Sequence, residues 1–227
     1  MHVAVNIELD KTQDFEVPYM SAEQIDYWLN KAIKRIVKQR YGGNNDSRTG
    51  FEQTQKRIDD LRLVTNYPQT PLGIPVLLPV TTAGNNFYQS LPTDYWFLVR
   101  MDVLTQYPGL PSQINPGQLV KQETVMTLQE DPFNRSFSGI PNYYILGNTV
   151  IFPTDGSFQI LGTTPYYIRV PGLVQLGTQY LIPGIDINCD LSFHIHDEVV
   201  DEAVLMLLEN IQEARVQTFS SLERQHE

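Results

Sequence analysis

Residue types and motifs that would indicate secretion or membrane insertion are scarce in this sequence. It contains one cysteine, Cys189, so no disulfide can form within the chain, which excludes a disulfide-framed secreted scaffold. No run of about 18 apolar residues occurs, and the N-terminal residues have neither a basic start nor an apolar block. We therefore expect a soluble protein made inside a cell, with no membrane partner and with Cys189 inert rather than reactive.

The motifs of common catalytic sites are also missing. The chain has no G-x-x-x-x-G-K phosphate loop, no G-x-G-x-x-G dinucleotide loop, no G-x-S-x-G nucleophile turn and no pairing of cysteine with histidine. Asp59 and Asp60 are adjacent in sequence rather than placed to face each other across a cleft. The sequence therefore predicts no catalytic residue, no cofactor and no metal ligand, in a protein that is not an enzyme.

Basic residues are outnumbered, and the charge is distributed unevenly. The formal net charge is −10 at pH 7, which argues against sequence-independent binding to nucleic-acid phosphates. Residues 1–65 carry ten basic and ten acidic side chains, whereas residues 186–227 carry two and ten, so most of the acidic excess is C-terminal. Fourteen of the fifteen prolines lie between Pro68 and Pro183, which excludes long helices from the middle of the chain.

These distributions predict an α+β fold with three regions. Residues 1–19 are expected to form an N-terminal extended arm. Residues 20–66 and 187–227 are expected to form one discontinuous helical domain, in which the N- and C-terminal helices make a small helical bundle. Residues 67–186 are expected to form a proline-rich, antiparallel β insertion between the two helical segments.

The predicted arm contains apolar residues that alternate as in a strand: Val3, Val5, Ile7 and Leu9. Such an arm can pair with the sheet edge of a neighbouring molecule. Ser21 and Gln24 can then form a capping box at the start of a helix from Ala22 to about Arg40. Apolar residues recur along this helix at helical spacing, and they are Ile25, Trp28, Leu29, Ala32, Ile33 and Ile36. A second helix is expected over residues 51–64.

The first predicted helix also has a charged face. The charged face is a basic stripe, which we interpret as solvated rather than as a polyanion contact: Lys31, Lys34, Arg35 and Lys38.

The last helix is expected from about His196 to Leu222, and it is apolar around most of its circumference. Four residues extend its apolar surface beyond one stripe: Val199, Leu205, Met206 and Leu208. This predicts burial against another subunit as well as against the first two helices.

The middle region is predicted to consist of short strands rich in aromatic and β-branched residues. Gly147 and Asn148 are residue types that supply the positive φ angles of a two-residue hairpin turn. Aromatic rings on such strands could stack on sugars or bases, but without basic neighbours we assign them to a core or a subunit interface. The expected strands cover residues 95–104, 119–128, 143–152, 158–161 and 166–170.

The sequence FHIHDEVVDEA, residues 193–203, raises the question of a metal site. His194 and His196 are two residues apart, which on a strand would place both rings on one face. A third histidine is missing, because the other two lie near the chain ends. Four acids fall in the first two turns of the predicted helix, where they interact favourably with its positive end: Asp197, Glu198, Asp201 and Glu202. We therefore favour helix initiation over a metal site.

Several strings occur in order along the two N-terminal helices, the β region and the C-terminal helix: EQIDYWLNKAIKRIVKQRYG (23–42), GFEQTQKRIDDLR (50–62), LPTDYWFLVRMDV (91–103), DPFNRSFSGIPNYY (131–144), TPYYIRVPG (164–172) and LSFHIHDEVVDEAV (191–204). In this order they resemble the head-to-tail connector adaptors of tailed bacteriophages, and are most similar to the ring proteins of crAss-like phages. The resemblance covers about Ser21 to Ala214 and rests on spaced hydrophobic and turn residues.

The resemblance implies a structural role in the virion. About a dozen copies would form a ring beneath the portal, extend the DNA channel used in genome ejection, and dock the portal to the tail. The implied partners are other copies of the chain, the portal protein and further ring or tail proteins, with DNA only in passage. The implied location is the portal–tail junction, after synthesis in the host cytoplasm. The acidic C-terminal region either lines the channel or faces a basic partner ring.

Two functions from other classes remain as alternatives. A β-rich carbohydrate-binding module would explain the aromatic residues of the middle region. A metal-dependent enzyme would explain His194 and His196. Neither explains the order of helices, β region and helix, so the sequence favours the ring subunit.

Overall fold

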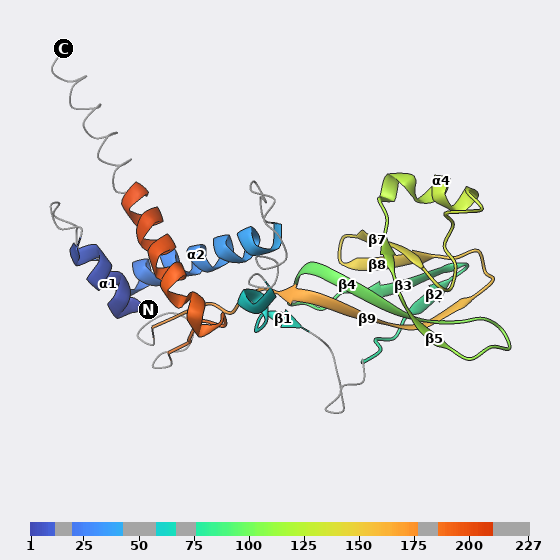
Figure 1. Cartoon of the computed structure of the whole chain (residues 1–227), viewed down its shortest axis with the longest axis horizontal. Helices are drawn as coiled ribbons and strands as arrows, with labels where there is room; N and C mark the ends of the chain where they lie inside the picture. The colour runs from blue at the N-terminus through green and yellow to red at the C-terminus, as the bar shows by residue number, and fades with distance from the viewer. Residues whose placement is uncertain (12–19, 43–57, 67–75, 177–185, 211–227) are drawn as a thin grey trace, which may run out of the picture. The chain divides into compact units, whose positions relative to one another are not determined.

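The protein, described here by a computed structural model, comprises a helical unit and a β-rich unit (Figure 1). Unit 1 contains Met1–Val64 and Pro171–Glu227, and unit 2 contains Thr65–Val170. The fold is therefore mixed α+β, in agreement with the expected class. The structure describes residues 1–11, 20–42, 58–66, 76–176 and 186–210.

The N-terminal residues form a helix, α1 (His2–Lys11), so the prediction of an extended arm over residues 1–19 is wrong for this part of it. Residues 12–19 lie outside the described residues. Of the four alternating apolar residues, two are buried and two are exposed: Val5 and Leu9 are buried, and Val3 and Ile7 are exposed. The same residues that alternate like a strand thus take two different faces of a helix.

The reason for this difference is that an alternating series also contains pairs four residues apart. Val5 and Leu9 form such a pair, and residues four apart share one face of a helix. That face is buried in unit 1, where α1 contacts α2 (Ala22–Gly42). His2 Nε2 also donates a 2.6 Å hydrogen bond to Asp26 Oδ1 in α2. These tertiary contacts select helix from a sequence pattern that suits either structure.

Helix α2 confirms both the predicted span and the predicted capping box. The Ser21 amide donates to Gln24 Oε1 at 3.0 Å, and the Gln24 amide donates to Ser21 Oγ at 3.4 Å. The Gln24 amide also donates to the Ser21 carbonyl at 3.0 Å, and the capping box gives the Ser21 amide a side-chain acceptor at the start of the helix. Five of the six predicted apolar residues are buried, and they are Ile25, Leu29, Ala32, Ile33 and Ile36.

The C-terminal helix begins at His196, as predicted. A 3-10 turn, η2 (Phe193–Ile195), leads into a helix over residues 196–210, named helix 196–210 below. The rest of the predicted span lies outside the described residues. Of the second predicted helix, residues 58–61 are helical, and residues 51–57 lie outside the described part. None of the helices in the described ranges combines enough length with enough apolar character to cross a bilayer.

Unit 2 ends earlier than the predicted β region of residues 67–186. The chain beyond Val170 belongs to unit 1, because it contacts α2. The Asn30 side-chain amide donates to the Val174 carbonyl and its oxygen accepts from the Val174 amide, both at 2.8 Å. A side-chain amide that pairs with one residue's backbone in both directions holds that segment as a neighbouring strand would.

Unit 2 contains two sheets with the strand orders β1-β9-β4-β5 and β2-β3-β8-β7-β6. Every pairing among these strands is antiparallel except that of β6 with β7, which is parallel. The antiparallel prediction is thus wrong for one short pair. The strands are β1 (Thr65–Asn66), β2 (Thr81–Ala83), β3 (Asn86–Ser90), β4 (Tyr95–Gln106), β5 (Gln113–Pro116), β6 (Gln118–Leu119), β7 (Asn142–Leu146), β8 (Thr149–Pro153) and β9 (Gln159–Arg169).

Some predicted strands differ from those observed. The hairpin turn between β7 and β8 is confirmed, with Gly147 at φ 59°. Residues 158–161 and 166–170 were expected as separate strands, but one strand, β9, covers most of both. The strand predicted over residues 119–128 is wrong after Leu119, because a 3-10 turn, η1 (Gln122–Thr124), and a helix, α4 (Val125–Glu130), follow. Met, Leu, Gln and Glu in this segment all favour helix.

The two sheets of unit 2 share one hydrophobic core. Tyr143 and Phe152, from β7 and β8, lie with ring centroids 5.6 Å apart. The assignment of the aromatic rings to a core is therefore confirmed for these residues. The buried residues of the core are Phe87, Leu91, Met101, Val103, Tyr143, Val150, Phe152, Phe158 and Ile160.

Truncation of Phe152 tests the importance of this core. Phe152→Ala is expected to destabilise unit 2 by about 3–5 kcal/mol, because it removes a fully buried ring and leaves a cavity. Phe133→Ala is the matched control and is expected to change stability by less than about 0.5 kcal/mol, because Phe133 is exposed. Hydrogen exchange of the β3 and β8 amides measures both. Equal effects of the two substitutions would contradict the core assignment.

Candidate functional site

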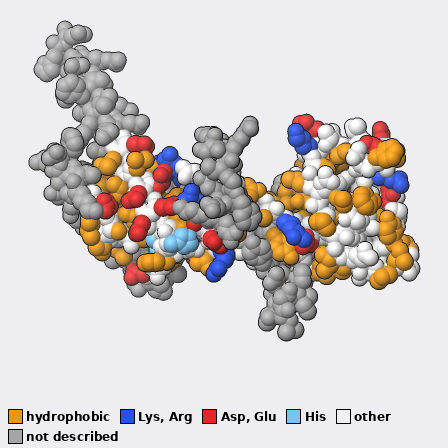
Figure 2. Space-filling model, in the orientation of Figure 1, with side chains coloured by type: hydrophobic (Ala, Val, Ile, Leu, Met, Phe, Trp, Pro, Cys, Tyr) orange, Lys and Arg blue, Asp and Glu red, His pale blue; other side chains and the backbone are white. Residues whose placement is uncertain are grey.

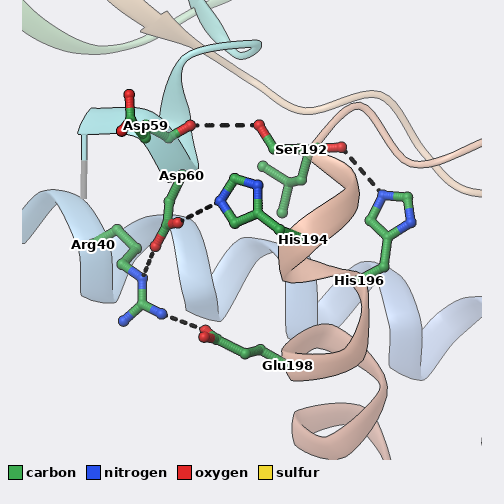
Figure 3. A network of polar contacts seen from close by, with 8 residues as sticks. Arg40, Asp59, Asp60, Ser192, His194, His196 and Glu198 are labelled. Carbon is green, nitrogen blue, oxygen red and sulfur yellow. Dashed lines mark hydrogen bonds and ion pairs between the residues drawn. The ribbon is translucent and has the colours of Figure 1, made fainter. Parts of the chain in front are cut away.

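A polar network in unit 1 joins segments that lie far apart in the sequence (Figure 3). Its centre is Asp60, whose side chain is completely buried. Arg40 Nε, on α2, donates to Asp60 Oδ2 at 2.7 Å, and His194 Nε2, in η2, donates to Asp60 Oδ1 at 2.9 Å. A buried carboxylate is costly unless its oxygens are paired in this way. The network therefore holds both sequence segments of unit 1 together.

Ion pairs extend this network along helix 196–210. Arg40 also binds Glu198, and Arg35 Nε lies 2.8 Å from Glu202 Oε1 in an ion pair without hydrogen-bond geometry. Glu198 and Glu202 are four residues apart, so they share the helix face that is turned toward α2. Two of the acids predicted to initiate the helix thus pair with α2. The prediction of a solvated basic stripe is corrected at Arg35.

The two histidines of the H-x-H sequence bind different groups. His194 donates to Asp60, whereas His196 Nε2 donates to the Leu191 carbonyl at 3.1 Å (Figure 3). The rings belong to a 3-10 turn and a helix start rather than to one face of a strand. Within the described ranges, no three His, Cys, Asp or Glu side chains gather as a candidate metal site. The arrangement favours a structural use of both histidines.

Most of the apolar side chains around helix 196–210 are buried within the chain itself. Burial within the chain accounts for most of these apolar residues, so contact of this helix with another subunit stays a prediction, for which Leu205, 49% exposed, is the available large apolar residue among the four. Of the three other residues that widen the apolar surface, Val199 and Met206 are buried and Leu208 is partly buried. The residues buried along the described part of the helix are Val199, Val200, Ala203, Val204, Met206 and Leu207.

A groove of about 600 Å³ is lined by residues of α2 and of helix 196–210. Its cations are those of the basic stripe, and Trp28 and Met206 contribute apolar surface. The Lys31 ammonium lies 4.6 Å from the centroid of the Trp28 ring, in cation–π contact. Glu209 also lines the groove. The lining thus combines several positive charges with an aromatic surface, which suits a partner that carries carboxylates and apolar groups.

Large apolar side chains are exposed on both units, and Figure 2 shows hydrophobic surface on each. Phe193, in η2 of unit 1, is 86% exposed. In unit 2, Met126 on α4 is 72% exposed and Phe133, shortly after α4, is 91% exposed. Single exposed apolar side chains are common on folded proteins, so these three residues mark separate candidate contact positions rather than one continuous apolar patch.

The lone cysteine lies in unit 1 and is partly buried. Burial raises the pKa of the Cys189 thiol above its ordinary value, and the charge of Asp190 acts in the same direction. A hydrogen bond from the Leu191 amide to Cys189 Sγ opposes this shift. Because the thiolate is the nucleophile, a raised pKa makes the thiol less reactive at neutral pH. The prediction of an inert cysteine agrees with this environment.

Comparison of the sequence with known proteins identifies no family for this chain. No model of a protein family matches the sequence, and a search of curated proteins finds no significant match.

Removal of the central carboxylate tests the polar network. Asp60→Ala is expected to destabilise unit 1 by about 1.5–3 kcal/mol, because Arg40 and His194 lose their hydrogen bonds to a shared carboxylate, although Arg40 keeps its ion pair with Glu198. Asp59→Ala is the control, since the Asp59 side chain is exposed and the substitution keeps its main-chain carbonyl, which accepts hydrogen bonds from Ser192 Oγ and the Arg62 amide. Urea unfolding followed by helical circular dichroism compares the two. A loss below about 1 kcal/mol for Asp60→Ala would be incompatible with this role of the network.

Alkylation tests the environment of Cys189. At pH 8, iodoacetamide is expected to react at least about tenfold more slowly with the folded protein than with the protein in urea, because burial raises the pKa of the thiol and limits access. The pH at which the rate reaches half its maximum should be higher for the folded state. Equal rates in the two states would contradict the burial of this side chain.

Proposed function

We propose that the protein is a structural virion component, a subunit of a ring in the portal–tail connector of a tailed phage. In this role the helices from both ends of the chain form a small bundle, and the proline-rich β region is an insertion in it. Rings of this kind dock the portal to the tail and extend the DNA channel. The protein is then not an enzyme, and its partners are other copies of itself, the portal and further ring or tail proteins.

The observation that carries the proposal is the exposure of large apolar side chains on both units. Phe193 on unit 1 and Met126 and Phe133 on unit 2 are each more than two-thirds exposed. A subunit of a closed ring needs one surface for each neighbour and further surfaces for the rings above and below. Three strongly exposed apolar side chains at separate positions fit contacts with several neighbours better than they fit one concave site for a small ligand.

The internal organisation of unit 1 also supports a structural role. Arg40, Asp60 and His194 bind one another and so join two segments of the chain. The carboxylate at their centre is buried, so it is not an accessible reaction centre. The histidines that motivated a metal-dependent enzyme are used in hydrogen bonds to Asp60 and to the Leu191 carbonyl. Tyr143 and Phe152, two of the aromatic residues that motivated a carbohydrate-binding module, are buried in a core. No observation favours a second candidate function.

The hypothesis that acids of the C-terminal region line the DNA channel applies to fewer residues once their contacts are known. Glu198 and Glu202 are ion-paired with α2, and Glu213 lies outside the described residues. Asp201 and Glu209 are exposed, so they can serve either alternative, a channel lining that does not bind DNA phosphates or a contact with a basic partner surface. The acids of helix 196–210 thus divide into a set that stabilises the unit and a set that faces outward.

Electron microscopy of the protein mixed with its portal and tail partners tests the ring. We expect annular stacks that contain the chain. Phe133→Ser should lower its incorporation at least about tenfold, because it removes an exposed apolar contact residue. Gln122→Ser, at an exposed polar position of η1, serves as the control and should incorporate normally. Absence of any annular assembly, or turnover of a small substrate by the purified chain, would refute the proposal.

A further inference from the structure

We propose that the groove between α2 and helix 196–210 binds the outward face of helix 196–210 of a second copy of this chain. The inference rests on the proposed ring function and identifies a contact between adjacent subunits. One copy contributes the basic groove, and the next contributes an acidic and apolar helix face. The two surfaces differ, so each copy can use both at once.

The groove carries an excess of positive charge. Its lining contains the four cations of the basic stripe and Glu209 as a carboxylate. Glu202 already neutralises Arg35, whereas Lys31 and Lys34 are exposed side chains beside Trp28. Cations on an aromatic, partly apolar surface gain most from carboxylates that arrive together with apolar side chains, because the apolar contacts exclude water from the ion pairs.

The outward face of helix 196–210 has the matching chemistry. Phe193, Asp197, Asp201 and Leu205 follow one another at intervals of four residues and therefore form one stripe along the helix and the turn before it. All four are exposed. The stripe has two carboxylates in its middle and an apolar side chain at each end. Figure 2 shows several acidic side chains on the visible face of unit 1.

The spacing of the charges agrees on the two surfaces. Lys31 and Lys34 are three residues apart on α2, and Asp197 and Asp201 are four residues apart on helix 196–210. With a rise of about 1.5 Å per residue, the lysines are about 4.5 Å apart along their helix axis and the aspartates about 6 Å. Both pairs therefore occupy about one helical turn, so two aspartates can meet two lysines at the same time.

The same chain already contains a smaller example of this recognition. Glu198 and Glu202, on the adjoining face of helix 196–210, pair with Arg40 and Arg35 of α2 within one molecule. Asp197 and Asp201 precede these two residues by one position, so they are turned about 100° away and cannot serve the same α2. A second copy presents an equivalent α2 to them. This makes the contact heterologous, since groove and stripe are different surfaces, and a heterologous contact that closes gives a ring.

Charge reversal tests the contact in two separate variants. Lys31→Glu with Lys34→Glu alters the groove, and Asp197→Lys with Asp201→Lys alters the stripe. Self-association, measured by sedimentation velocity over a concentration series with and without the portal, is expected to weaken at least about tenfold in each variant. An equimolar mixture of the two is expected to regain association, because the reversed groove of one fits the reversed stripe of the other. Lys121→Glu with Glu123→Lys, at exposed positions of unit 2, is the control.

The outcomes separate this inference from the ring function. Association of both variants like the wild type, with annular stacks still formed, would overturn the groove contact and leave the ring proposal standing. Loss in both variants without recovery in the mixture would also overturn it. Recovery in the mixture, but in assemblies without annular form, would support the contact and contradict the ring. A wild-type chain that stays monomeric with and without the portal would contradict both.

Discussion

A fully buried carboxylate, that of Asp60, is the constraint on which the helical unit depends. It lies between Arg40 and His194, which come from segments on opposite sides of the β-rich unit in the sequence. Since an unpaired charge in this position would cost several kcal/mol, the unit is stable only when both segments are present and correctly aligned. The two helical segments, which the β-rich unit separates in the sequence, thereby form one helical unit.

This arrangement gives helix 196–210 two different polar faces. One face carries Glu198 and Glu202 and pairs with α2 of the same molecule, while the next face carries Asp197 and Asp201 and is exposed. The apolar residues of the helix are buried almost completely within unit 1. The surface left for partners is therefore mainly acidic, with Leu205 and Phe193 as its large apolar groups. Such a surface suits contacts that are selective in partner and sensitive to salt.

The β-rich unit offers a different kind of surface. Its aromatic rings are divided between a core, where Tyr143 and Phe152 pack together, and isolated exposed positions such as Phe133. The segment between β6 and β7 carries α4 and exposes both Met126 and Phe133. A ring subunit of the proposed kind would use the helical unit for charged contacts and this segment for apolar ones, so the two classes of interface would fail under different conditions.

The sequence by itself determined the features that depend on neighbours along the chain. The capping box of Ser21 and Gln24, the apolar face of α2 and the turn at Gly147 were all predicted, because local spacing and φ preferences specify them. Residues 119–128 were predicted as a strand, but a helix covers part of this segment. The local pattern was ambiguous here, because a short apolar segment can suit either strand or helix.

Only the tertiary structure decided the remaining features, because each depends on contacts between distant residues. The N-terminal apolar series forms a helix, α1, which contacts α2 and buries Val5 and Leu9. Nothing in the sequence distinguishes Asp60 from its neighbour Asp59, yet one is buried between Arg40 and His194 and the other is exposed. Burial and charge pairing are set by the three-dimensional arrangement, and they determine which acids stabilise the fold and which are free to face a partner.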